Sequence, residues 1–137
     1  MILVDTGPLV ALFDPRDEAH ARCVEVLKSI SEPIATTVPV LTEAVHLLQP
    51  GSIGTQRLID FITGGGIEVL FLDDQLLERA LKLMVQYRDA PMDFADASLV
   101  AVAESRNLRT VFTVDRKDFA IYRIKRGHRY FALGVIG

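Results

Sequence analysis

The sequence predicts an α/β fold, an α/β/α sandwich in which helices cover both faces of a central, mainly parallel sheet. Short apolar runs typical of buried strands alternate along the chain with segments whose apolar residues recur at helical spacing. Strands separated by helices pair in parallel and need helices on both faces of their sheet. The 137 residues, half of them hydrophobic, contain no repeat or low-complexity linker. We therefore expect one domain, residues 1–137, with a core of its own.

The first half of the chain predicts two strands and four helical segments. Ile2–Val4 is a buried strand, and Pro8–Phe13 forms a short helical turn because proline costs little in the first turn of a helix. Asp17–Ile30 is a helix, since its apolar residues recur at helical spacing and two acidic residues stand at its positive end. The next predicted elements are a strand at Ile34–Thr36 and helices at Pro39–Leu48 and Gly54–Ile62.

The second half of the chain predicts two strands, two helices and an extended tail. Ile67–Leu72 has the clearest strand pattern, and Thr110–Val114 is the second strand. Between them, Asp74–Tyr87 and Asp93–Ser105 are helices. The final stretch, Tyr122–Val135, predicts a pair of extended segments around Gly127.

Composition narrows the cellular setting that we expect. Cys23 is the only cysteine, so the chain forms no intramolecular disulfide, which fits a reducing compartment. Its place in a helical pattern predicts a packing role. The sequence shows neither a leader pattern nor an apolar run near the about 18 residues that a membrane span requires. We therefore expect a cytoplasmic protein that does not associate with membranes.

Basic residues gather near the end of a chain whose net charge is −3. Six of the fifteen Lys and Arg residues are Arg116, Lys117, Arg123, Lys125, Arg126 and Arg129. Such a cluster could follow a phosphate backbone, which makes these residues candidates for RNA binding. The same charges could instead keep the edge of a solvated hairpin from pairing with other chains. The sequence does not distinguish these two interpretations.

Two carboxylates follow predicted strands at the edge where parallel α/β sheets bind ligands. Asp5 comes directly after Ile2–Val4, and Asp115 comes directly after Thr110–Val114. An aspartate in such a position is also a common helix N-cap or turn residue. Position alone therefore leaves both a cap and a site open for each of them.

Glu43 lies on an apolar stripe of its predicted helix, formed by Val40, Ala44 and Leu47. An unpaired carboxylate on such a surface is costly or takes up a proton, so Glu43 needs a cation or hydrogen-bond donors. His46 lies three residues further along, but a single Glu-x-x-His is a weak metal motif. We expect His46 to pack against another helix.

Two further aspartates stand at the head of the helix predicted at Asp93–Ser105. Anions there are stabilised by about 0.3–1 kcal/mol each, and one of them is needed as the cap. Asp96 lies inside the helix on a face that continues with apolar residues. We therefore assign the cap to Asp93, which is also a candidate supporting residue of the site, and the site itself to Asp96.

Four carboxylates from separate elements can converge on one rim of the sheet: Asp5, Glu43, Asp96 and Asp115. Their mutual repulsion would raise several pKa values unless a divalent cation lay among them. Oxygen ligands without cysteine favour a hard ion such as Mg²⁺ or Mn²⁺, which commonly shares its coordination with phosphate. The expected chemistry is phosphodiester hydrolysis by a metal-activated water.

Four segments resemble, in order, the motifs of the PIN-domain family. They are "VDTGPLVALFD", "VLTEAVHLL", "DFADASLVAVAE" and "TVFTVDRKDF". The similarity extends from Ile2 to about Phe119 and is greatest to the VapC-type toxin ribonucleases of prokaryotic toxin–antitoxin pairs. The order of the four motifs is specific, whereas any one motif alone is not.

The resemblance implies a PIN-like sandwich in which the same four carboxylates hold Mg²⁺ or Mn²⁺. It makes Thr6 a supporting hydroxyl beside the metal, and Asp118 could share the role of Asp115. It further implies a homodimer that forms one continuous RNA groove and an antitoxin that occupies the acidic site. The prediction is therefore a metal-dependent endoribonuclease that is the toxin of a type II pair.

Three alternatives accompany this prediction. A housekeeping RNA-processing nuclease would use the same residues. A catalytically silent module that binds RNA or protein would use the acidic rim only for docking. A phosphatase of the haloacid dehalogenase type also places Asp after its first strand, but it needs Asp-x-Asp where this chain has Asp5-Thr6-Gly7.

Overall fold

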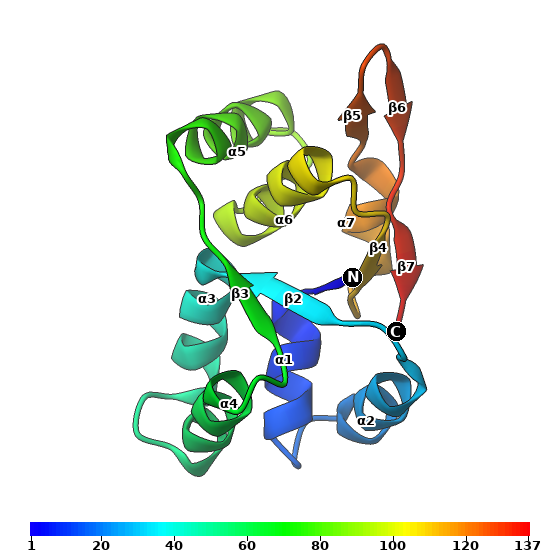
Figure 1. The fold of residues 1–137 in the computed structure, drawn as a ribbon. Coiled ribbons are helices and arrows are strands. Elements are labelled where there is room, and N and C mark those ends of the chain that lie inside the picture. Colours follow the sequence, from blue (N-terminus) through cyan, green and yellow to red (C-terminus); the bar gives the residue numbers. More distant parts are fainter.

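The computed structural model describes residues 1–137 and confirms the α/β/α sandwich around a central parallel sheet (Figure 1). The sheet has five strands in the order β3-β2-β1-β4-β7, and every neighbouring pair is parallel. These strands are β1 (Ile2–Val4), β2 (Ile34–Thr37), β3 (Glu68–Leu70), β4 (Thr110–Phe112) and β7 (Gly134–Ile136). The chain builds outward from β1 and then returns to its other side with β4. The carboxyl ends of β1 and β4 therefore flank the point where strand order reverses, the usual ligand position in such sheets.

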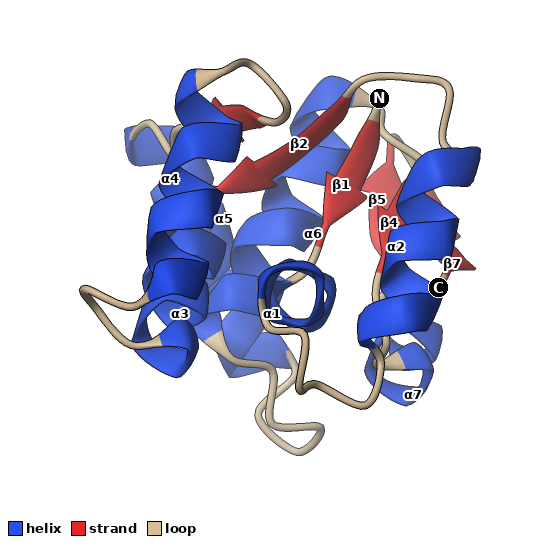
Figure 2. Ribbon diagram, turned by 90° about the horizontal axis from the view of Figure 1, so that it is seen from below, coloured by secondary structure: helices blue, strands red, loops and turns tan.

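Helices cover both faces of the sheet (Figures 1 and 2). One layer holds α1 (Thr6–Phe13), α2 (His20–Ser29) and α4 (Ile53–Thr63). The opposite layer holds α5 (Asp74–Gln86) and α6 (Phe94–Arg106). The remaining helices are α3 (Val38–Leu48), which contacts both α1 and α6, and the short α7 (Arg116–Ile121). None of these helices combines the length and apolarity that crossing a bilayer requires.

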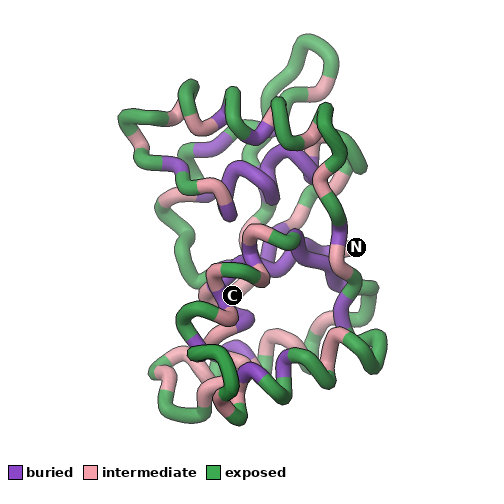
Figure 3. The backbone as a smooth tube through the Cα atoms, turned by 90° about the vertical axis from the view of Figure 1, so that its left-hand side faces the viewer, coloured by how far each residue is buried: buried purple, intermediate pink, exposed green.

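Burial is concentrated in the inner strands and in α6 (Figure 3). Leu3, Val4, Val111 and Phe112 in β1 and β4 are completely buried. Every residue from Ala95 to Ala103 is also buried, because α6 lies between the sheet, α5 and the C-terminal hairpin. Surrounding contacts of this kind explain why α6 is apolar nearly all round rather than on one stripe.

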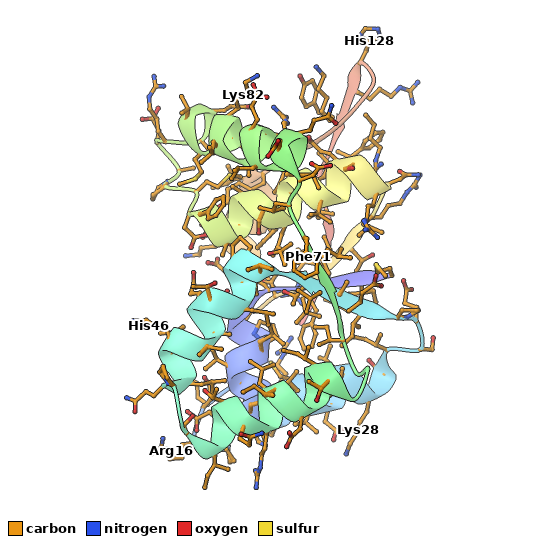
Figure 4. The ribbon with its side chains drawn as sticks, turned by 60° about the vertical axis from the view of Figure 1, so that its left-hand side comes forward. Arg16, Lys28, His46, Phe71, Lys82 and His128 are labelled. Atoms are coloured by element: carbon orange, nitrogen blue, oxygen red, sulfur yellow. The ribbon has the colours of Figure 1, made fainter.

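The C-terminal tail forms more structure than the pair of extended segments that the sequence predicts. The antiparallel hairpin of β5 (Ile124–Arg126) and β6 (Arg129–Phe131) turns at Gly127, whose φ of +60° favours glycine. In Figure 1 the hairpin extends beyond α6, and Figure 4 shows His128 at its tip. The chain then returns to add β7 to the main sheet beside β4.

Two predictions for the first half of the chain need correction. The helix predicted from Asp17 begins only at His20, because Asp17 accepts a hydrogen bond from the Ala19 backbone N–H at 2.8 Å and holds a turn before the helix. His46 does not pack against another helix. It is exposed on α3 and points outward in Figure 4. Cys23, in contrast, is fully buried in the core as predicted.

Candidate active site

A cleft of about 530 Å³ opens at the carboxyl ends of β1 and β4. Eight carboxylates line it: Asp5, Asp17, Glu18, Glu43, Asp93, Asp96, Asp115 and Asp118. The structure thus brings together the four predicted ligands and the two predicted supporting aspartates. The sequence did not predict the other two, Asp17 and Glu18, because they belong to the turn before α2 and not to a strand end.

Asp5 is held rigidly at the base of the cleft. Its side chain is 6% exposed, and one oxygen accepts a hydrogen bond of 2.8 Å from the backbone N–H of Thr6 as the cap of α1. The other oxygen accepts a 2.8 Å hydrogen bond from the Thr113 hydroxyl. Burial outweighs these donors and raises the pKa of Asp5 to about 6.

Asp96 is the second buried carboxylate, with 9% of its surface exposed. Its Oδ2 accepts a 2.8 Å hydrogen bond from the Tyr122 hydroxyl. Burial, followed by the charges of Asp5 and Asp93, raises the pKa of Asp96 to about 8. Burial also raises the pKa of Tyr122, so the phenol keeps its proton and acts as the donor.

Asp93 caps α6 as predicted, since its side chain accepts a 2.8 Å hydrogen bond from the backbone N–H of Asp96. It also lines the cleft, and its charge contributes to the raised pKa values of Asp5, Glu43 and Asp96. The capping role therefore leaves Asp93 within the electrostatic site.

Glu43 reaches the cleft from α3 and is half-buried. Burial is the largest cause of its raised pKa, with the charge of Asp93 next. The Thr6 hydroxyl lies near enough to lower that pKa, yet it does not form a hydrogen bond of good geometry. Thr6 Oγ1 is in fact the one buried side-chain oxygen or nitrogen without a hydrogen-bond partner. Such an orphaned oxygen in the lining of an acidic cleft is suited to a cation or its bound water.

Asp115 and Asp118 stand at the exposed mouth of the cleft. Asp115 caps α7 and accepts a 3.3 Å hydrogen bond from the backbone N–H of Asp118. The neighbouring Asp115 carboxylate raises the pKa of Asp118. The Thr113 hydroxyl, which donates to Asp5, also accepts a 3.0 Å hydrogen bond from the backbone N–H of Asp115. Thr113 therefore joins the two strand-end aspartates.

No cation of the protein neutralises this cleft. The five salt bridges of the structure all lie elsewhere and include none of its carboxylates. As the side chains stand, no three acidic, histidine or cysteine residues lie close enough to hold a metal ion. The potential ligands nevertheless fit a hard divalent cation, because all of them are oxygen atoms. They include buried carboxyl groups with raised pKa values and the Thr6 hydroxyl, which has no hydrogen-bond partner.

The six basic residues of the C-terminal cluster divide into two groups. The first group donates hydrogen bonds to backbone carbonyls. Arg116 donates to Gly137 at 2.8 Å, Arg123 to Ala120 at 2.6 Å, and Arg126 to Leu108 at 2.8 Å. Lys117, Lys125 and Arg129 are exposed and make no side-chain hydrogen bond or ion pair. The second group is free to bind a ligand.

Comparisons with known proteins agree with the observed fold. The PIN domain model matches residues 2–126, and the chain belongs to the PIN domain family. Ribonuclease VapC26 of Mycobacterium tuberculosis is 27% identical over 131 residues, which cover 94% of this chain and 97% of that protein.

Solved structures show the same fold. The sarcin-ricin loop cleaving toxin VapC20 of M. tuberculosis superposes with a TM-score of 0.80 at 22% identity, over 88% of this chain and 94% of that chain. A toxin–antitoxin complex from Klebsiella pneumoniae superposes with a TM-score of 0.69 at 21% identity, over 88% of this chain and 92% of that chain. DNA-bound VapBC from Salmonella typhimurium gives a TM-score of 0.61 at 18% identity and covers 99% and 98% of the two chains.

Besides Asp17 and Glu18, sequence reasoning missed two hydrogen-bond donors of the site, Thr113 and Tyr122. Both are buried and donate hydrogen bonds to the buried carboxylates. Thr113 had one available signal, because a hydroxyl within the apolar run before Asp115 needs a partner. Tyr122 had none, since its partner lies 26 residues earlier in the chain.

Proposed function

We propose that this protein is an endoribonuclease that depends on Mg²⁺ or Mn²⁺ and is the toxin of a type II toxin–antitoxin pair. The observation that carries the proposal is a cleft of carboxylates, two of them buried with pKa values of about 6 and about 8, without a protein cation. The family and the similarity to a ribonuclease support RNA as the substrate.

Asp5, Glu43, Asp96 and Asp115 would hold the metal, with Thr6 and Asp118 beside them. When bound, the metal supplies an activated water for attack on phosphorus and offsets charge on the leaving oxygen. Asp5 and Asp96 are fixed by the donors on their Oδ2 atoms. In the metal-free protein these two carboxyls retain protons at higher pH than ordinary aspartates, and metal binding releases those protons.

The proposed partners are an antitoxin and a second copy of the chain. Two of the similar solved structures are a toxin–antitoxin complex and a VapBC assembly. An antitoxin segment with a cationic side chain would complement the unpaired carboxylates of the cleft. Exposed apolar side chains on α5 favour a homodimer and are considered below.

The proposal is tested by cleavage of a mixed RNA with purified protein in Mg²⁺, in Mn²⁺ and in EDTA. Asp96→Asn should reduce the cleavage rate by more than about 100-fold, because loss of even an outer partner of a metal ligand costs about 10- to 100-fold. Glu18→Gln is the matched control, since Glu18 lines the cleft, is exposed and lies outside the proposed ligand set. Its rate should stay near that of the wild type.

Cleavage that persists in EDTA or in Asp96→Asn would contradict the metal site. Absence of cleavage in every metal, by folded protein free of a bound inhibitor, would favour the silent binding module. Expression of the active protein in cells without its proposed antitoxin distinguishes a toxin from a housekeeping nuclease. A toxin should arrest growth, and a housekeeping nuclease should not.

A further inference from the structure

Tyr122 lies outside all four PIN motifs, yet it is the side chain that contacts Asp96 most directly. It is 1% exposed and follows the last residue of α7. Its hydroxyl donates a 2.8 Å hydrogen bond to Oδ2 of Asp96, and no other group donates to either side-chain oxygen of Asp96. One oxygen of this carboxylate is therefore bound to the protein, and Oδ1 remains available to the cleft.

The ring of Tyr122 is held on two sides by aromatic neighbours. Tyr87 packs against it edge to face at a centroid distance of 5.4 Å and an interplanar angle of 73°. Phe119 packs similarly at 5.3 Å and 79°. The Tyr87 hydroxyl accepts a hydrogen bond from the backbone N–H of Arg123 at 3.0 Å, which fixes that ring as well. The phenol of Tyr122 is thus a preorganised donor aimed at one carboxylate oxygen.

A carboxylate with no partner can rotate about its last side-chain bond and can bind a metal through either oxygen or both. A fixed donor on one oxygen removes this freedom. Outer partners of metal ligands orient the ligand in this way, and their loss lowers metal affinity.

We infer that Tyr122 is a positioning residue that orients Asp96 for metal binding by occupying Oδ2. The inference rests on the proposed function, because it requires Asp96 to be a ligand. A purely structural role, in which Asp96 merely satisfies a buried phenol, would leave metal affinity unchanged when the hydroxyl is removed.

Tyr122→Phe tests the inference because it removes the hydroxyl and keeps the ring between Tyr87 and Phe119. Mn²⁺ affinity is measured by calorimetric titration of wild type, Tyr122→Phe and Tyr87→Phe at one pH. Tyr122→Phe should bind Mn²⁺ about 10-fold or more weakly. Tyr87→Phe is the matched control: it also loses a hydrogen-bonded hydroxyl in this aromatic cluster, but it does not touch Asp96. Its affinity should stay within about 2-fold of wild type.

Cleavage provides a second measurement. The Mn²⁺ concentration for half-maximal activity of Tyr122→Phe should rise by the same factor as the dissociation constant, with KM for RNA unchanged. Thermal unfolding of the metal-free variants checks that all remain folded.

The outcomes separate this inference from the proposed function. If wild type binds Mn²⁺, Asp96→Asn does not, and Tyr122→Phe binds as well as wild type, the positioning role is overturned and the metal site stands. If wild type binds no Mn²⁺, or Asp96→Asn binds it equally well, both are overturned. Weaker binding by Tyr122→Phe alone, with Tyr87→Phe unchanged, supports both.

Discussion

Asp5, Asp93 and Asp115 each cap a helix and also line the cleft. In the sequence, cap and site were alternative interpretations of Asp5 and Asp115. The structure combines them, because a helix that begins where a parallel strand ends places its N-cap at the ligand-binding edge of the sheet. A carboxylate that accepts one capping hydrogen bond keeps lone pairs for a further partner. A capping role is therefore no argument against a metal ligand in this fold.

The buried carboxyls predict an unusual pH dependence of stability in the metal-free protein. Unfolded aspartates ionise near 3.8, whereas Asp5 keeps its proton to about pH 6 and Asp96 to about pH 8 in the folded protein. The folded state thus binds more protons over this interval, so the free energy of unfolding decreases as pH rises from 3.8 to about 8. With about 1.4 kcal/mol per pKa unit, the two raised pKa values together correspond to a loss of up to about 9 kcal/mol.

Thermal unfolding in EDTA should therefore show a Tm lower by about 5 °C or more at pH 8 than at pH 5. Asp96→Asn lacks the largest of these shifts and should exceed wild type in Tm at pH 8. Saturating Mn²⁺ should remove most of the pH dependence of wild type. A wild-type Tm that is constant or increases over this range in EDTA would contradict the protonated state of the site.

At the scale of elements, hydropathy periodicity predicted every long helix and the presence of the first four strands of the main sheet. It predicted neither α7 nor β7. Both are short, at six and three residues, so neither repeats a pattern often enough to be recognised. α7 depends instead on the cap supplied by Asp115, and β7 depends on pairing with β4. The predicted strand at Thr110–Val114 ends two residues early, at Phe112.

Residues of the candidate site could be predicted where a carboxylate stood in a position that needs an explanation, as for Asp5 directly after a strand or Glu43 on an apolar helix face. The supporting contacts were not, because they join distant segments. Thr113 reaches Asp5 across 108 residues of sequence, and Tyr122 reaches Asp96 across 26. The sequence states which groups need partners and does not state which partners they have.

The β5–β6 hairpin carries a prediction about RNA binding. Lys125 and Arg129 are exposed and unpaired, whereas Arg126 is engaged at the end of α6 by the carbonyls of Ala103 and Leu108. If the hairpin contacts RNA, Lys125→Gln with Arg129→Gln should weaken binding and reduce the slope of log K against log salt by about 1.4, or about 0.7 per phosphate contact.

Binding is measured in the Asp96→Asn background, so that RNA is not cut during the titration. Lys28→Gln with Lys82→Gln is the control, since it removes the same charge from α2 and α5 (Figure 4). An equal loss of affinity in both double variants would indicate a general effect of charge. No loss in the hairpin variant would favour the interpretation that these charges protect an edge.

At the scale of the whole molecule, one side of α5 exposes a row of large apolar side chains to solvent. Leu77, Leu81 and Val85 follow one another at i, i+4 and i+8 and are 40%, 49% and 62% exposed. Phe71, on the segment that enters α5, is 75% exposed (Figure 4). Contiguous apolar surface on a helix usually marks an interaction site. A two-fold dimer through α5 would bury this stripe against its own copy.

Leu81→Asp is expected to convert the proposed homodimer to a monomer. The dimer would have to bury the new, unpaired carboxylate twice, at a cost of several kcal/mol for each copy. Sedimentation or light scattering gives the mass, and Lys82→Gln, one position away on the same helix and exposed (Figure 4), should leave it unchanged.

Because α5 contributes no residue to the acidic cleft, the Leu81→Asp monomer should bind Mn²⁺ like wild type. Its KM for RNA should rise, since a groove formed by two copies would be halved. A wild-type protein that is monomeric at all concentrations, or a Leu81→Asp variant that remains dimeric, would exclude α5 as the dimer interface and leave the metal site unaffected.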